Sequence, residues 1–220
     1  MNFKAIITAG GNSNRFGDTN KLLEKIHSKE VIRHTIDAFL NINEIDEIII
    51  CAHLSIIDEL KQIFNDEDKI RIIEGEKTRQ QSVFNGLLVA DCDYVLIHDG
   101  ARPMITPEVI KKAIETVQIQ KALTVATKTI DTIKQVDENL KIIKTIERSA
   151  LYNTQTPQAF EYNLIKSAHE KLAGQDFTDD AGMLEYLDYN VYILEGDYKN
   201  IKITTKDDIG IAKAYLKSEM

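Results

Sequence analysis

Short runs of aliphatic and β-branched residues alternate with helical patterns along this chain, and this alternation restricts its fold more than any other feature. The runs occupy residues 4–8, 47–52, 69–74 and 94–99. Apolar residues recur at helical spacing in the segments 31–40, 55–64, 79–90 and 107–118. Strands separated by helices join through right-handed crossovers into a mostly parallel sheet. We therefore predict one α/β domain over residues 1–220, built on a Rossmann-like, doubly wound sheet.

Three helix starts carry capping signals. Ser55 is expected to cap the helix at 55–64, and Thr106 precedes a proline at the first helical position. Thr205 and Asp208 have the spacing of a capping box, which predicts a final helix from Asp208. Two short apolar runs before it, "VYILEG" and "NIKITT", are expected to be strands.

One segment breaks the alternation. In "TIKQVDENLKIIKTI" two β-like runs flank "DEN", a pattern typical of a β-hairpin. We predict a hairpin arm at about residues 129–148 that projects from the doubly wound core. Such an arm is a candidate dimer contact or lid.

Composition excludes several classes of protein. A net charge of −8 argues against nucleic acid as the main partner, because phosphate backbones need clustered Lys and Arg. No apolar run approaches the roughly 18 residues of a membrane span, and the N-terminal run lacks a signal-peptide cleavage site. These features predict a soluble, cytoplasmic protein. Cys51 and Cys92 lack metal-ligand spacing and are expected to be free thiols.

The stretch "AGGNSNRFGDTNK" follows the first predicted strand. Gly10, Gly11 and Gly17 would let backbone N–H groups approach an anion closely. Arg15 and Lys21 add the two cations that a triphosphate needs in an acidic protein. The stretch matches neither the dinucleotide fingerprint nor the Walker loop. From these residues alone, a flexible strand-to-helix turn stays the alternative.

A second group of polar residues follows the strand at 94–99. Asp99, at the end of that strand, would suit Mg²⁺ beside phosphate oxygens, although an Asp-Gly turn explains it equally well. His98 is interpreted as a core or turn histidine. Lys202 alternates with two isoleucines, so it faces away from them. That face is either solvent or an anionic cleft.

Taken together, these segments resemble the 2-C-methyl-D-erythritol 4-phosphate cytidylyltransferase family of the non-mevalonate isoprenoid pathway. The resemblance runs almost end to end and lies in eight motifs in the family's order: "AGG…R.G…K", "TRQQSVFNGL", "LIHDGARP", "DTIK", "ER", "TPQAF", "TDDAGMLE" and "NIKITTKDD". It implies an enzyme that joins CTP and methylerythritol phosphate to give a cytidine diphosphate ester and pyrophosphate.

The resemblance implies a role for each matching residue on the nucleotide side. The loop of Ala9, Gly10 and Gly11, with Arg15 and Lys21, would hold the CTP triphosphate. Ser82 and backbone groups around Gly75 would contact cytosine and ribose. Asp99 would hold Mg²⁺ or another divalent cation, and Lys202 would contact the α-phosphate.

On the acceptor side, the resemblance implies that four residues cradle methylerythritol phosphate: Thr132, Arg148, Thr156 and Thr178. Family members are dimers that exchange the hairpin, so Thr132 and Arg148 would serve the partner's site. A phosphate oxygen of the acceptor would attack the α-phosphorus of CTP in line. Catalysis would then be placement and charge neutralisation by Arg15, Lys21, Lys202 and the metal.

Some residues have structural alternatives. Arg79 could fix its own loop, Thr156 could only shape the turn before Pro157, and at least one of Asp179 and Asp180 is expected to cap a helix.

The chain departs from the family pattern at three places. Asn20 stands where a proline is usual, Gly75-Glu76 replaces a Gly-Gly pair, and Gly182 replaces a serine.

Three other functions fit the sequence less well. A ribitol 5-phosphate cytidylyltransferase would share the fold and the CTP site, but "DTIK", "TPQAF" and "TDDA" favour methylerythritol phosphate. A non-catalytic nucleotide-binding regulator would be expected to lose the set of Lys and Arg residues that this chain keeps. A nicotinamide dehydrogenase is disfavoured because the dinucleotide fingerprint is missing.

Overall fold

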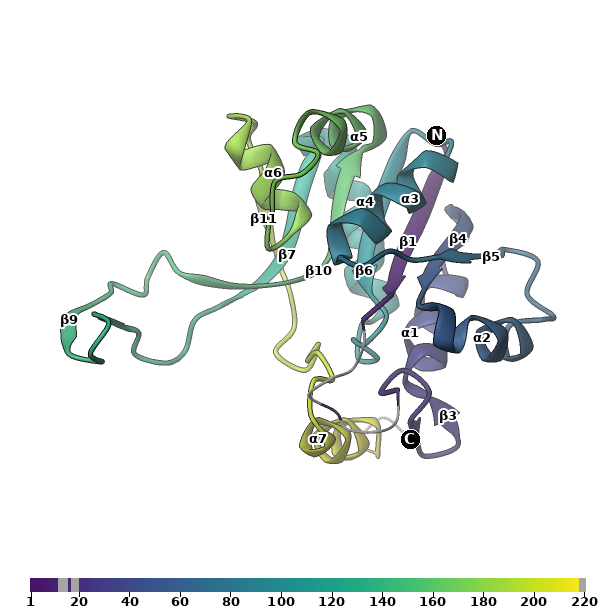
Figure 1. Cartoon of the computed structure of the whole chain (residues 1–220), viewed down its shortest axis with the longest axis horizontal. Coiled ribbons are helices and arrows are strands. Elements are labelled where there is room, and N and C mark those ends of the chain that lie inside the picture. The colour runs from purple at the N-terminus through teal and green to yellow at the C-terminus, as the bar shows by residue number, and fades with distance from the viewer. Residues whose placement is uncertain (12–15, 17–19, 218–220) are drawn as a thin grey trace.

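The computed structural model describes residues 1–11, 16 and 20–217 and contains a seven-stranded sheet in the order β11-β7-β10-β6-β1-β4-β5 (Figure 1). β10 runs antiparallel to both of its neighbours, and the other pairs are parallel. The strands are β1 (Phe3–Ala9), β4 (Ile45–Ala52), β5 (Ile70–Glu74), β6 (Tyr94–Asp99), β7 (Ala122–Lys128), β10 (Tyr152–Glu161) and β11 (Tyr192–Glu195). The predicted mostly parallel α/β fold is confirmed.

Helices cover both faces of the sheet. They are α1 (Val31–Leu40), α2 (Ile57–Ile63), α3 (Arg79–Val89), α4 (Pro107–Gln120), α5 (Tyr162–Lys171), α6 (Asp180–Tyr186) and α7 (Lys206–Lys217). A 3₁₀ turn, η1 (Leu54–Ile56), precedes α2, and the two-residue strands β2 (Lys25–Ile26) and β3 (Lys29–Glu30) pair before α1. Within the described part of the chain, no helix is both long and apolar enough to span a membrane.

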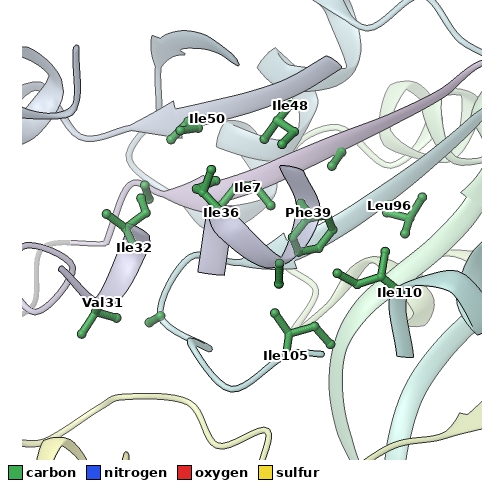
Figure 2. Close-up of a cluster of buried hydrophobic side chains, with 14 of the residues drawn as sticks. Ile7, Val31, Ile32, Ile36, Phe39, Ile48, Ile50, Leu96, Ile105 and Ile110 are labelled. Atoms are coloured by element: carbon green, nitrogen blue, oxygen red, sulfur yellow. The ribbon is translucent and has the colours of Figure 1, made fainter. Parts of the chain in front are cut away.

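The core lies in two layers, one on each face of the sheet. On β1, Ile7 packs into the layer beneath α1 and α4, whereas its neighbour Ile6 packs into the layer beneath α3 and α5. Figure 2 shows the first layer, where Ile36 and Phe39 of α1 meet the strands. Because the central strands are buried on both faces, their sequences are continuous apolar runs and do not alternate between apolar and polar residues.

The hairpin arm is present. β8 (Lys134–Val136) pairs antiparallel with β9 (Ile142–Thr145), and Figure 1 shows this pair at the end of a long excursion away from the sheet. The turn forms around Asp137, whose carboxylate accepts hydrogen bonds from the backbone N–H groups of Asn139 and Lys141. Asp137 is the first residue of the predicted "DEN" turn.

Three local predictions were wrong. Ser55 does not cap a helix but lies within η1, where the His53 side chain accepts from its N–H group. Residues 200–205 belong to no strand, and Ile203 donates its backbone N–H to the carbonyl of Ala101, a loop residue. The last helix starts at Lys206 and not at Asp208.

Among the strands of the seven-stranded sheet and the α-helices, three elements were not anticipated: β7, β10 and α5. β10 contains Pro157, which argues against a central strand because proline cannot donate to the ladder. The structure resolves the conflict with a shift of register between Thr154 and Gln158, where the pairing with β7 is interrupted.

Candidate active site

A pocket of about 170 Å³ opens at the carboxyl ends of β1 and β6. This is where open α/β sheets bind ligands. The described residues of its lining are Thr8, Ala9, Gly10, Gly11, Lys21, Leu22, Lys77, Thr78, Arg79, Ser82, Asp99, Ala101 and Lys202. Four of them are cations and one is a carboxylate, so the pocket is positive although the chain as a whole carries a net charge of −8. We call it the glycine-loop pocket.

A second pocket of about 250 Å³ adjoins the first and shares Arg79, Asp99 and Lys202 with it. The other residues of its lining are Arg102, Thr154, Gln155, Thr156, Gln158, Thr178 and Asp179. Most of these are hydroxyl or amide side chains from β10 and from the start of α6. We call it the threonine pocket. The three shared residues mark the boundary between the two.

Asp99 lies at that boundary with three cations around it. Its Oδ2 atom is 2.8 Å from Lys202 Nζ and 3.5 Å from Arg102 Nε, and its Oδ1 atom is 3.4 Å from Arg79 Nε. Burial by itself would raise the pKa of Asp99, but Lys202, Arg79 and Arg102 outweigh burial and hold that pKa well below its usual range. Asp99 is therefore a carboxylate at every physiological pH.

Lys202 reaches Asp99 because the segment that carries it, 200–205, is anchored on both sides. Upstream, Asn200 is 2% exposed and donates its side-chain amide to the Thr156 carbonyl. Downstream, the Ile203 backbone N–H donates to the Ala101 carbonyl. The Lys202 side chain itself is 43% exposed. Of the two faces that the sequence left open, it takes the one toward the pockets.

Lys21 enters the glycine-loop pocket from another direction. Its Nζ donates to the Ile203 carbonyl at 2.8 Å, which ties the loop after β1 to the Lys202 segment. Asn20 forms the turn before it, since its side-chain oxygen accepts from the Leu22 backbone N–H. An asparagine turn thus stands where the family has a proline.

Ser82 closes the floor of the glycine-loop pocket. Its hydroxyl donates to the Thr78 carbonyl at 2.9 Å and accepts from the Glu76 N–H at 2.8 Å. A Cβ atom added at Gly10 would lie 3.0 Å from this hydroxyl, and one at Gly75 3.2 Å. The glycines at these two positions let both loops close around Ser82, which is 1% exposed.

Thr156 lies behind Asp99 in the threonine pocket. Its hydroxyl accepts from the Asp99 backbone N–H at 3.1 Å and lies 2.9 Å from His98 Nδ1. Burial lowers the pKa of His98 to about 3, so His98 is neutral. Its Nδ1 atom accepts a hydrogen bond from the Thr156 hydroxyl. The interpretation of His98 as a core histidine is confirmed, and Thr156 both supports Asp99 and lines the pocket.

The start of α6 forms the far side of the threonine pocket. Asp179 caps this helix, with its Oδ1 atom accepting from the Gly182 N–H at 3.0 Å, as expected for one of the two aspartates. Gln158 is fully buried and donates to Asp179 while accepting from the Asp180 N–H. These contacts fix Thr178 at the rim of the pocket.

Not all of the predicted site residues lie together in this chain. Thr132 and Arg148 are exposed on the arm and line neither pocket. Arg148 donates instead to the Ile130 carbonyl, across the base of the arm. Arg15 and Gly17 lie outside the described residues. The remaining predicted residues line the two pockets, except that Gly75 contacts the floor from behind Ser82.

The carboxylate of Asp99 fits a magnesium ion that takes its other ligands from phosphate oxygens and water. Among the described residues there is no cluster of three or more His, Cys, Asp or Glu that could enclose a metal. Mg²⁺ commonly takes one or two carboxylates and completes its shell with phosphate oxygens and water. A single ionised aspartate beside a positive, phosphate-sized pocket suits that mode of binding.

The sequence interpretation missed several residues of the site. Lys77 lines the glycine-loop pocket, and Arg102 lines the threonine pocket and donates to the Asn200 carbonyl. Arg79 binds Asp99 and Asp180 and not loop carbonyls. Its position at the start of α3, after the capping residue Thr78, was a usable signal, since a helix N-terminus beside a glycine loop favours an anion site.

Comparison with known proteins agrees with this geometry. Residues 3–218 match the family model of 2-C-methyl-D-erythritol 4-phosphate cytidylyltransferase. Proteins of that name from Caldanaerobacter subterraneus and Clostridioides difficile are each 40% identical, covering 99% of this chain and 100% and 94% of their own lengths.

Solved structures give the same result. The 4-diphosphocytidyl-2C-methyl-D-erythritol synthase from Anaerococcus prevotii is 38% identical, covers 98% of this chain and 96% of its own, and superposes with a TM-score of 0.89. The Francisella tularensis cytidylyltransferase superposes with a TM-score of 0.82 at 29% identity, with both chains covered in full. This chain belongs to the 2-C-methyl-D-erythritol 4-phosphate cytidylyltransferase family.

Proposed function

We propose that this chain transfers the cytidylyl group of CTP to 2-C-methyl-D-erythritol 4-phosphate and releases pyrophosphate. The observation that carries the proposal is the pair of adjoining pockets, one positive and one lined by hydroxyls and amides, that meet at Asp99, Arg79 and Lys202. A reaction between two phosphates needs two such sites with shared cations between them. The names of the family and of its relatives support the choice of substrates.

The glycine-loop pocket is the proposed CTP site. Backbone N–H groups of Gly10 and Gly11 would face the triphosphate, together with Lys21 and, outside the described residues, Arg15. The N-terminus of α3 also borders this pocket and adds its positive dipole end. The backbone around Gly75 and Ser82, at the floor, would contact cytosine and ribose.

The threonine pocket is the proposed acceptor site. Thr156 and Thr178 would bind the methylerythritol phosphate from this chain, beside Arg102. Thr132 and Arg148 would reach the site from a second subunit. Six apolar side chains of the arm are exposed: Ile130, Ile133, Val136, Leu140, Ile142 and Ile143. A cluster of this kind on a projecting hairpin supports a homodimer formed through the arm.

The proposed reaction needs placement and charge neutralisation and no protein nucleophile. An acceptor phosphate oxygen forms a bond to the α-phosphorus of CTP, and the bond from that phosphorus to the oxygen bridging to the β-phosphorus breaks, so that pyrophosphate carries away the electron pair. Lys202 is exposed enough to move from Asp99 to the α-phosphate. A divalent cation held by Asp99 would supply further neutralisation of the phosphates.

Other groups near the site are unsuited to covalent or base catalysis. The pKa of His98 is lowered by burial to about 3, so His98 is hydrogen-bonded as a neutral imidazole within the core. Burial raises the pKa of Cys51 to about 12, which keeps its thiol protonated; Cys92, whose pKa burial also raises to about 12, precedes β6 at the edge of the sheet opposite the pockets. The chemistry that we propose is therefore charge stabilisation by Lys, Arg and a divalent cation.

The deciding measurement is release of pyrophosphate from CTP by the purified chain with Mg²⁺, run in parallel with methylerythritol phosphate, ribitol 5-phosphate and no acceptor. We expect release with methylerythritol phosphate and at most a hundredth of that rate with ribitol 5-phosphate, because the acceptor hydroxyls must match fixed hydrogen-bonding groups. Equal or faster release with ribitol 5-phosphate would move the chain to pentitol phosphates. No release of pyrophosphate under any of the three conditions would refute the proposed activity.

A further inference from the structure

A row of buried polar side chains leads from α5 to the boundary between the two pockets. His169 Nε2 lies 3.1 Å from Asp180 Oδ1, Asp180 Oδ2 lies 2.7 Å from Arg79 Nη1, and Arg79 Nε lies 3.4 Å from Asp99 Oδ1. His169 is 3% exposed and Asp180 1%. The row therefore connects the core beneath α5 with the centre of the site.

Arg79 is the residue of this row that can contact a ligand. It lines both pockets, and its side chain is 27% exposed. Its Nε and Nη1 atoms are bound to Asp99 and Asp180, whereas no described residue accepts a hydrogen bond from Nη2. Because Arg79 lines both pockets and is partly exposed, its guanidinium is accessible to a bound ligand.

We propose that His169 is a positioning residue of this enzyme, which acts through Asp180 to hold the Arg79 guanidinium in the plane that serves both pockets. The proposal extends the function proposed above and rests on it for its kinetic consequence. It assigns His169 no contact with either substrate.

The physical reason lies in the conformational freedom of the Arg79 and Asp180 side chains. Arginine has several rotatable bonds and must be ordered before it can bind a phosphate in a fixed direction. A carboxylate only accepts hydrogen bonds, so His169 must carry its proton on Nε2 and donate it to Asp180. That bond, and the Asp180 N–H bond to Gln158, leave Asp180 one orientation and hence leave Arg79 one orientation.

The surroundings of His169 fit a fixed ring. Its imidazole is parallel to the ring of Phe84 on α3, with an angle of 4° between the planes and 6.0 Å between the centroids. The same helix carries Arg79 at its first position. Stacking thus holds His169 against the same helix that carries Arg79.

The test compares His169→Leu with His169→Gln. Glutamine can present an N–H group to Asp180, whereas leucine removes the donor and keeps similar bulk. We expect His169→Leu to lower kcat/KM about tenfold, as is common when the partner that orients a ligand-binding group is lost, and His169→Gln to stay within about threefold of the wild type. Leu172→Ala, a large-to-small change at a buried residue beside α5, controls for general loosening of this region.

A double mutant separates positioning from stability. If His169 acts through Arg79, adding His169→Leu to Arg79→Lys should cost little beyond the Arg79→Lys change alone. A full additional tenfold loss in that background would overturn the proposal, as would a folded His169→Leu protein with wild-type kcat/KM.

A readout without substrate keeps the two proposals distinguishable. The Arg79 side-chain Nε–H resonance, assigned by its absence in Arg79→Lys, should be sharp and slow to exchange in the wild type and should broaden or vanish in His169→Leu while persisting in Leu172→Ala. An unchanged resonance in His169→Leu would overturn the positioning role. If the wild type shows the resonance but releases no pyrophosphate, the proposed function fails and the positioning role stands.

Discussion

Asp180 illustrates how single residues determine the electrostatics of this protein. Burial alone would raise the pKa of its carboxyl, but Arg79 and His169 outweigh burial and lower that pKa. The folded chain therefore releases the Asp180 proton more readily than the unfolded chain does, in which the pKa is about 3.9. The stability that Asp180 contributes is complete above about pH 4 and is lost as the pH falls through the lower pKa of the folded state.

The lowered pKa of Asp180 leads to a prediction for the variant Asp180→Asn. At pH 7 the variant should lose about 3 kcal/mol of unfolding free energy, because Arg79 loses the nearer of its two buried counterions and keeps only Asp99. The difference in unfolding free energy between the variant and the wild type should narrow as the pH falls below about 4, because the wild type loses the same interaction there. Urea unfolding at several pH values from 7 down to about 2.5 measures the difference in unfolding free energy across the pH window in which the wild type loses this interaction. Asp176→Asn, at an exposed position, is the control, and a difference that does not change with pH would contradict the prediction.

At the scale of elements, the segment 200–205 before α7 is the one that the site depends on most. It has no sheet partner, and the Asp208 carboxylate holds its end by accepting from the backbone N–H groups of Thr204 and Thr205, each at 2.8 Å. One half of the predicted capping box is thus present, the bond from the Thr205 N–H, directly before the helix, to the Asp208 side chain. Because Lys202 lies two residues before Thr204, the cap also limits where Lys202 can go.

Asp208→Ala should therefore affect both stability and rate. We expect a loss of about 1 kcal/mol in unfolding free energy, the usual cost of a lost cap, and a fall of several-fold in kcat. Asp207→Ala, one residue earlier in the same helical turn, is the matched control and should leave kcat unchanged. Thermal unfolding and pyrophosphate release measure the two effects. A lower stability with unchanged kcat would mean that the cap holds α7 but not Lys202.

At the scale of the whole molecule, the site that we propose depends on the arm. Figure 1 shows the arm extending away from the sheet, and its residues Thr132 and Arg148 line neither pocket of their own chain. Two subunits that exchange arms would bring these residues to each other's threonine pocket. The proposed active site then needs a dimer, with each site built from two chains.

Mixing two inactive variants tests this arrangement. If Arg148 serves the partner's site, a heterodimer of Lys202→Met and Arg148→Ala subunits carries both lesions in one site and none in the other. Random reassociation of equal amounts should restore about a quarter of the wild-type sites. If Arg148 serves its own chain, every site in the mixture keeps one lesion. Activity of the mixture no greater than that of the separate variants would rule out exchange of the arm.

Much of this molecule was predictable from the order of its residues. Burial on both faces makes the strands β1, β4 and β6 continuous apolar runs, and the helices between them show their own period, so the parallel sheet follows from local patterns. Glycines and single cations at strand ends likewise indicated the pocket, because the carboxyl ends of parallel strands share one edge of the sheet. Asp99, Lys21 and Lys202 could be named for that reason.

The remaining features depend on contacts between distant parts of the chain. Asp99 is 103 positions before Lys202 in sequence and 2.8 Å from it in the fold, and no local pattern contains such a contact. The same holds for Arg79 with Asp180 and for His169 beneath them. Sequence alone determined the type of sheet, the edge that binds and the charges available there. Tertiary structure decided which charges meet, because ion pairing depends on separation in space and on burial, and packing determines both.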